Sequence, residues 1–158
     1  MNKYVKITIS ISVCLLVAFL ASFATQSSVK TWFVTIEKPF FNPPSWLFAP
    51  VWTLLYIMMG IAVGLIWSSD FKDRKMVKSA MIIFGIQLGL NALWSILFFG
   101  LRNPLLAFIE ILLLWLFIFE TIKAFRPIDC LASKLLYPYL AWVSFATILN
   151  ASIWWLNK

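Results

Sequence analysis

Five long apolar stretches follow one another along the chain and are separated by short polar segments. They cover residues 7–25, 46–67, 79–99, 104–122 and 135–156. Each holds about 20 residues, the length at which a helix crosses the hydrocarbon core of a bilayer. Backbone groups in lipid must be satisfied within the protein, which favours helices here. The pattern therefore predicts an all-α integral membrane protein, a bundle of five transmembrane helices forming one domain over residues 1–158.

The composition agrees with this prediction. Of the 158 residues, 63% are hydrophobic and 12% are charged, and the mean hydropathy is +0.93. Soluble domains have about half of their residues apolar and about a quarter charged. Few residues remain outside the five spans, so a separate soluble domain does not fit. We therefore expect the function to lie in the bundle and its loops.

Lysine and arginine fall unevenly on the two sides that alternating spans create. One side holds the basic residues near the N-terminus, at 72–78 and at 123–134. The other side holds only Lys30, Lys38, Arg102 and Lys158. By the positive-inside rule the N-terminus is cytoplasmic and the C-terminus lies outside, as suits a bacterial cytoplasmic membrane. The formal net charge of +7 then reflects topology, with a smaller contribution from anionic lipid, and indicates no nucleic-acid partner.

Residues 1–24 allow a second interpretation, a cleaved secretory signal. Lys3 and Lys6, an apolar stretch and the small residues around Ala24 fit such a segment. The apolar stretch is longer than the ~7 to 15 residues expected of a signal peptide, however. We therefore favour a first transmembrane helix.

Cysteine and histidine exclude several kinds of chemistry. Cys14 lies within the first span and Cys130 in a cytoplasmic loop, so a structural disulfide is not indicated. The chain has no histidine, the commonest metal ligand and the usual general base of nucleophilic catalysis. No metal-ligand cluster or phosphate-binding loop appears either. The sequence therefore predicts no metal site and no bound cofactor.

Several of the nine tryptophans lie within spans, where an indole N–H needs a partner or a pocket. In the third span Gln87, Asn91 and Trp94 recur at helical spacing and share one face, which suits a polar cavity. Gly85 and Gly89 lie on the opposite face. This GxxxG pair favours close helix contact, within the bundle or across a dimer.

Three other spans place comparable residues at a similar depth. In the second span Trp52 and Tyr56 share a face that is flanked by a further GxxxG pair, Gly60 and Gly64. The fourth span carries Glu110, an intramembrane acid that is either functional or a protonated or Arg102-paired structural residue. The fifth span presents a ring, a gap and an amide on one face: Trp142, Ala146 and Asn150. We expect these residues to line one outward-facing pocket for a flat, largely apolar ligand.

Four separated stretches resemble a known family. They are KPFFNPPSW at 38–46, preceded by Trp32, then PVWTLLY at 50–56, NALWSILFFG at 91–100 and PYLAWVSFATILN at 138–150. In this order and spacing they closely resemble the translocator protein family, also called the tryptophan-rich sensory proteins or TspO/MBR. The resemblance spans essentially the whole chain. It implies a five-helix bundle, commonly a homodimer, that binds porphyrins such as protoporphyrin IX and, in many members, isoquinoline carboxamide or benzodiazepine drugs.

The resemblance also implies roles for single residues. Trp52 and Trp142 match the tryptophans implicated in porphyrin binding and, in some bacterial members, in porphyrin breakdown under light and oxygen. Other matches to the family's pocket are Asn91, Glu110, Ala146 and Asn150. The long first loop, residues 26–44, would be a lid whose Trp32, Phe40 and Phe41 cover the mouth of the cavity. The animal members' cholesterol-recognition pattern is absent after Asn150, so cholesterol binding is not expected.

Three functions follow as hypotheses. The first is a membrane receptor or sensor that binds porphyrins with Trp32, Trp52, Tyr56, Asn91, Trp94, Glu110, Trp142, Ala146 and Asn150. The second is an enzyme that degrades protoporphyrin by a photo-oxidative route, with Trp52 and Trp142 as catalytic residues. The third is a tetrapyrrole transporter, which the absence of inverted repeats disfavours.

Overall fold

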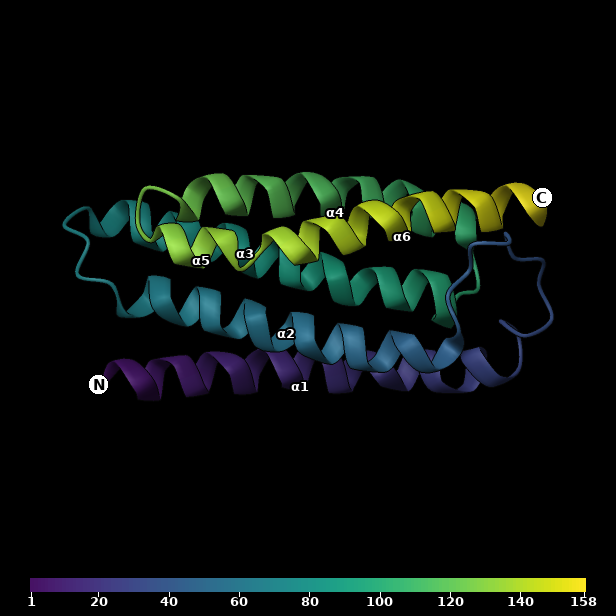
Figure 1. Ribbon diagram of the computed structural model, residues 1–158, viewed down its shortest axis with the longest axis horizontal. Helices are drawn as coiled ribbons and strands as arrows, with labels where there is room; N and C mark the ends of the chain where they lie inside the picture. Colours follow the sequence, from purple (N-terminus) through teal and green to yellow (C-terminus); the bar gives the residue numbers. More distant parts are fainter.

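The computed structural model describes residues 1–158 and contains helices without any strand (Figure 1). A π-helical segment, η1, directly extends α3, and the short α5 leads into α6. The elements are α1 (Lys3–Lys30), α2 (Ser45–Ser68), α3 (Arg74–Ser95), η1 (Ile96–Gly100), α4 (Pro104–Phe125), α5 (Cys130–Lys134) and α6 (Tyr137–Leu156). Five helical segments are long and apolar enough to cross a membrane, with α3–η1 and α5–α6 each counted as one. The expected five-helix bundle is confirmed.

Side-chain caps mark where most of the helices begin. Asn2 accepts a hydrogen bond from the backbone N–H of Tyr4 at 3.0 Å, and Asn103 accepts one from Leu106 at 3.0 Å. Asp73 and Asp129 cap α3 and α5 in the same way. Such bonds satisfy amide groups that a helix leaves unpaired at its first turn. α2 instead begins directly after Pro44, without a side-chain cap.

Helix α1 is longer than the apolar pattern predicts. It continues to Lys30, so the first loop begins at residue 31 and the expected loop range of 26–44 is too long by five residues. The added helical turn brings Gln26, Val29 and Lys30 into the lining of a cavity. We call the end of the bundle that holds loop 31–44 the loop end.

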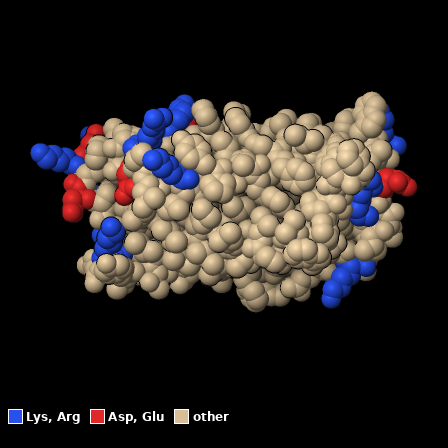
Figure 2. All heavy atoms as spheres, viewed as in Figure 1, with Lys and Arg blue, Asp and Glu red and all other residues tan.

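The two chain termini lie at opposite ends of the bundle, with the C-terminus at the loop end (Figure 1). Lysine, arginine, aspartate and glutamate gather at these two ends, and the band between them is uncharged in the view of Figure 2. Exposed apolar side chains such as Ile82, Ile86, Leu113 and Leu116 belong to helix faces between the ends. An uncharged apolar band of this kind is what a bilayer requires of a spanning bundle.

The two GxxxG pairs have different surroundings. A Cβ atom on Gly64 would lie 2.7 Å from the Cα of Ile7 in α1, and one on Gly60 would overlap the backbone of Ile11. The pair in α2 therefore lets the α1 backbone approach closely. No atom lies within 4 Å of a Cβ built on Gly85 or Gly89, so the pair in α3 makes no close contact within the chain.

Candidate ligand-binding pocket

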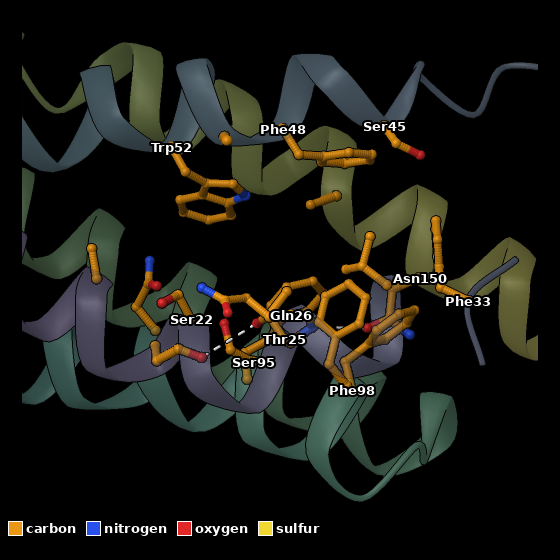
Figure 3. Close-up of a pocket in the computed structure, with 18 of the residues that line it drawn as sticks. Ser22, Thr25, Gln26, Phe33, Ser45, Phe48, Trp52, Ser95, Phe98 and Asn150 are labelled. Carbon is orange, nitrogen blue, oxygen red and sulfur yellow. Dashed lines mark hydrogen bonds between the residues drawn. The ribbon is translucent and has the colours of Figure 1, made fainter. Parts of the chain in front are cut away.

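A cavity of about 440 Å³ lies between the helices toward the loop end (Figure 3). It is lined by 25 residues, 16 of them hydrophobic, which come from α1, α2, α3, η1, α6 and the first loop. Helix α4 contributes none of them. The volume falls within the range of about 300–1,000 Å³ that small-molecule pockets occupy.

Aromatic rings from α2 and α6 form one wall of the cavity. The Trp52 and Trp142 rings meet edge to face, with centroids 6.4 Å apart and planes at 89°. Phe48 lies 6.1 Å from Trp142, and Phe145 lies 5.6 Å from it. In Figure 3, Phe48 and Trp52 project from α2 into the cavity. Edge-to-face contacts of this kind fix the ring orientations, so the wall is preformed.

Rings from α3 and η1 form the facing wall. Trp94 and Phe98 stack with centroids 5.2 Å apart and planes at 23°. In η1 the Leu101 N–H bonds to Ile96 O at 2.8 Å, one residue further back than in an α-helix. Single π-helical turns are frequent at functional sites. Ser28 of α1 donates its hydroxyl to Phe99 O at 2.5 Å and holds this turn against α1.

Polar side chains at the floor of the cavity are tied together by hydrogen bonds. The Tyr56 hydroxyl donates to Asn91 Oδ1 at 2.6 Å, and Asn91 Nδ2 donates to the Tyr139 hydroxyl at 2.5 Å. Tyr139 in turn donates to Gln87 Oε1 at 2.9 Å. All four side chains are buried, and only Tyr56 and Asn91 line the cavity. A fully bonded polar network inside an apolar bundle holds its members in one arrangement.

The two cavity tryptophans of α3 and α6 differ in their hydrogen bonding. Trp94 donates its indole N–H to Asn150 Oδ1 at 2.9 Å, and Asn150 Nδ2 donates to Pro104 O at 2.8 Å. The indole nitrogen of Trp142 is buried and has no partner. A buried donor without a partner is costly. Trp142 is therefore a cavity-lining tryptophan whose buried indole donor remains unsatisfied within the bundle.

Helix α1 supplies a wall that the sequence analysis did not predict. Its lining residues are small or polar: Ala18, Ala21, Ser22, Thr25, Gln26, Val29 and Lys30. Ser22 donates its hydroxyl to Phe19 O at 2.6 Å, and Thr25 donates to Ala21 O at 3.3 Å. The signal for this wall is the succession of Ser, Thr and Gln at 22–26 within an otherwise apolar segment.

Two of the expected pocket residues lie outside the cavity lining. Glu110 is at a comparable depth but belongs to α4, whose inner face packs against α3 and α6 instead of facing the cavity. Its carboxylate is buried, and neither oxygen has a partner. Arg102 is not the partner of Glu110, because the Arg102 Nε instead donates to the Ser28 hydroxyl at 3.4 Å.

Trp32, the second of these residues, packs against Phe98, with ring centroids 5.6 Å apart. The neighbouring Phe33 lines the cavity in its place.

The expected aromatic lid is only partly formed. Phe41 packs on Phe145 at 6.2 Å, at the mouth of the cavity, whereas the Phe40 side chain is fully exposed. The other expected residues line the cavity together: Trp52, Tyr56, Asn91, Trp94, Trp142, Ala146 and Asn150.

Comparisons with known proteins show the family to which the chain belongs. Residues 10–156 match the model of the TspO/MBR family. The chain belongs to this family. It is 47% identical over 152 residues to the tryptophan-rich protein TspO of Archaeoglobus fulgidus, covering 96% of this chain and 97% of that protein. Membership in the TspO/MBR family and the five apolar helices together make the chain an integral membrane protein.

More distant TspO/MBR relatives also cover most of the chain. The translocator protein of Ovis aries is 39% identical over 127 residues, 80% of this chain and 75% of that protein. The tryptophan-rich sensory protein of Cereibacter sphaeroides is 34% identical over 126 residues, 80% of this chain and 77% of that protein. The likeness therefore extends over several of the helices that line the cavity.

Proposed function

We propose that the chain is a membrane receptor or sensor that binds porphyrins, such as protoporphyrin IX, and related flat hydrophobic ligands in the cavity. The observation that carries the proposal is the pair Trp52 and Trp142, which meet edge to face beside an indole N–H without a partner. Flat aromatic walls favour a planar apolar body. The relatives named sensory protein and translocator protein support a receptor role.

The edges of the cavity fit the polar groups of such a ligand. Lys30 lines the cavity at the loop end, is exposed, and has no acidic partner. A cation at the mouth of an apolar cavity suits a ligand that carries carboxylates on one edge. Protoporphyrin IX is planar and carries two propionates on one side, so its body would lie among the rings and its acids near Lys30.

Loop 31–44 is the proposed lid. Phe33 and Phe41 rest on rings of the two cavity walls, at 6.3 Å from Phe98 and 6.2 Å from Phe145. Its prolines limit the entropy that ordering over a ligand costs.

In the proposed topology the N-terminus is cytoplasmic and the loop end lies outside, in a bacterial cytoplasmic membrane. We further propose a homodimer through the open α3 face at Gly85 and Gly89.

Photo-oxidative degradation of the porphyrin is the second candidate function. The observation that favours it is the contact between Trp52 and Trp142, since two indoles would then border a ligand that absorbs light and sensitises oxygen. On this hypothesis Trp52 and Trp142 are catalytic, and a product absent from free porphyrin appears under illumination.

One experiment tests both functions. Purified protein is titrated with protoporphyrin IX in the dark while tryptophan fluorescence is followed, and the complex is then illuminated and its absorption spectrum recorded. Trp52→Phe and Trp142→Phe are compared with Trp155→Phe, a control at an exposed ring outside the cavity.

The outcomes separate the hypotheses. Saturable quenching with an unchanged porphyrin spectrum, weakened in the two cavity variants only, supports a receptor or sensor. Conversion to a new species that depends on both cavity tryptophans supports the enzyme. The absence of saturable quenching in the unaltered protein contradicts both.

A further inference from the structure

The seam between α1 and α2 is tightly closed in the half nearer the N-terminus. There Gly60 and Gly64 face Ile11 and Ile7, and even a methyl group on either glycine would overlap α1. Eleven residues make about three helical turns, so the same two faces continue along both helices at that spacing. On α2 the continuing positions are Ala49 and Thr53, and on α1 they are Ala18 and Ser22.

In the half nearer the loop end the same seam is open. Ala18 and Ser22 from α1, and Ala49 and Thr53 from α2, all line the cavity. Ala49 and Thr53 are exposed and Ala18 and Ser22 are half-buried, which fits an opening of the cavity between these helices. Figure 3 shows Ser22 on α1 and Trp52 on α2 on opposite sides of the cavity.

The mouth at the loop end is partly covered by loop 31–44. Loop 31–44 places Phe33 over Phe98 and Phe99, with ring centroids 6.3 and 5.7 Å apart. It is tied to the end of α6 by two hydrogen bonds: the Glu37 N–H donates to Asn157 Oδ1 at 2.9 Å, and Asn157 Nδ2 donates to Glu37 O at 2.8 Å. A ligand that entered from this end would have to break these contacts first.

The surroundings of the open seam are apolar. Phe19 and Phe23 on α1 are 59% and 62% exposed, and Leu54 on α2 is 58% exposed, as expected of lipid-facing side chains. The hydroxyls in the seam are satisfied within their own helices, since Ser22 donates to Phe19 O at 2.6 Å and Thr53 donates to Ala49 O at 2.8 Å. The opening thus offers short side chains and no free donor to the bilayer.

We propose that this opening, between Ala18 and Ser22 on one side and Ala49 and Thr53 on the other, is a lateral gate. Hydrophobic ligands dissolved in the bilayer reach the cavity through it. The inference rests on the proposed binding function and adds the route and the class of ligand, molecules that partition into membranes. Small side chains at these four positions then determine entry, and the tryptophans determine binding.

The test uses the full chain in lipid nanodiscs and stopped-flow quenching by protoporphyrin IX. Ala49→Phe and Thr53→Phe place a ring in the opening. Leu54→Phe is the matched control, because it adds a ring to the next position of α2 on the exposed surface. We expect the two seam variants to slow association by about tenfold and to slow dissociation as well, because a gate changes both rates. Leu54→Phe keeps the unaltered rates.

Other results contradict the gate. If Ala49→Phe weakens equilibrium binding and leaves the association rate unchanged, the ring fills the cavity and no gate has been closed. If Asn157→Ala, which frees the loop, accelerates association while both seam variants bind at the unaltered rate, the ligand enters beneath the loop. Ala18→Leu gives a milder obstruction should a ring at position 49 or 53 prevent folding. Failure of the unaltered protein to bind refutes the proposed function itself and is recognisable without any variant.

Discussion

Trp94 and Asn150 are joined across the α3–α6 interface by a hydrogen bond of 2.9 Å from the indole nitrogen to the amide oxygen. The same asparagine donates to Pro104 O at 2.8 Å, so it links three helices at the edge of the cavity. One side chain therefore sets the orientation of a cavity ring and the position of the first turn of α4.

Replacing Asn150 by leucine should both destabilise the bundle and weaken binding. The Trp94 N–H and the Pro104 carbonyl lose their partner in an apolar interior, at a cost of about 1–2 kcal/mol in the free energy of unfolding. The ring is then free to rotate, and we expect the Kd for protoporphyrin IX to rise about threefold. Denaturant unfolding in detergent and fluorescence titration measure the two effects.

Ser144→Ala is the control for this variant. It removes the 2.8 Å hydrogen bond from the Trp115 indole N–H to the Ser144 hydroxyl, and neither residue lines the cavity. A comparable loss of stability with unchanged affinity is expected. Equal weakening of binding by both variants would show that Asn150 acts through general stability alone.

The glycine pairs give a prediction about packing. Gly60→Ala should destabilise the bundle by about 2 kcal/mol, because its methyl group meets the backbone of Ile11 and α1 must move. Gly85→Ala meets no atom and should stay within about 0.5 kcal/mol of the unaltered protein. Thermal unfolding in detergent compares the two, and similar melting temperatures would refute the close α1–α2 contact.

The number and position of the helices could be predicted from the sequence because bilayer thickness fixes the length of an apolar span. The shared face of Asn91 and Trp94 could also be predicted, since helical spacing determines direction around one axis. Spacing says nothing of how separate helices are rotated against one another. Glu110 was for that reason assigned to the cavity from its depth, although α4 turns it elsewhere.

The α1 wall was missed for a related reason. The first span was expected to end at residue 25 and a loop to begin at residue 26, and no pocket residue was assigned to this span. The helix continues because serine and threonine hydroxyls bond to carbonyls one turn earlier and so remain compatible with helix in lipid. In the loop, Trp32 and Phe33 are neighbours of similar character, and only tertiary packing decides which of them faces the cavity.

Glu110 should tolerate removal of its charge. Its carboxylate has no partner and lies outside the cavity lining, so Glu110→Gln should leave the Kd for porphyrin within about twofold of the original value. Glu110→Leu should stabilise the bundle by about 1 kcal/mol, because an apolar side chain needs no partner there. A tenfold loss of affinity in Glu110→Gln, with stability retained, would place the acid in the binding mechanism after all.

The open face of α3 gives a prediction about assembly. Gly89→Leu adds a large side chain where the chain itself offers no contact, so the fold of the monomer should be unaffected. A second copy packed on this face would be displaced, and we expect the dimer fraction in nanodiscs or by chemical crosslinking to fall several-fold. Leu54→Phe, at an exposed position of α2, provides the comparison. An unchanged dimer fraction in Gly89→Leu would place the interface elsewhere.

Lys30 provides the sharpest test of ligand chemistry at the mouth of the cavity. Lys30→Gln keeps a polar side chain, one atom shorter, but removes the charge proposed to attract ligand carboxylates. Because the site is exposed, we expect the Kd for protoporphyrin IX to rise only about threefold, and less at high salt. The dimethyl ester of the same porphyrin has no charge and should bind both forms equally. Lys3→Gln, at the opposite end of the bundle, should alter neither affinity. An equal effect of Lys30→Gln on acid and ester would mean that this lysine acts through its alkyl chain, and the anionic edge of the ligand would then have to face another part of the cavity.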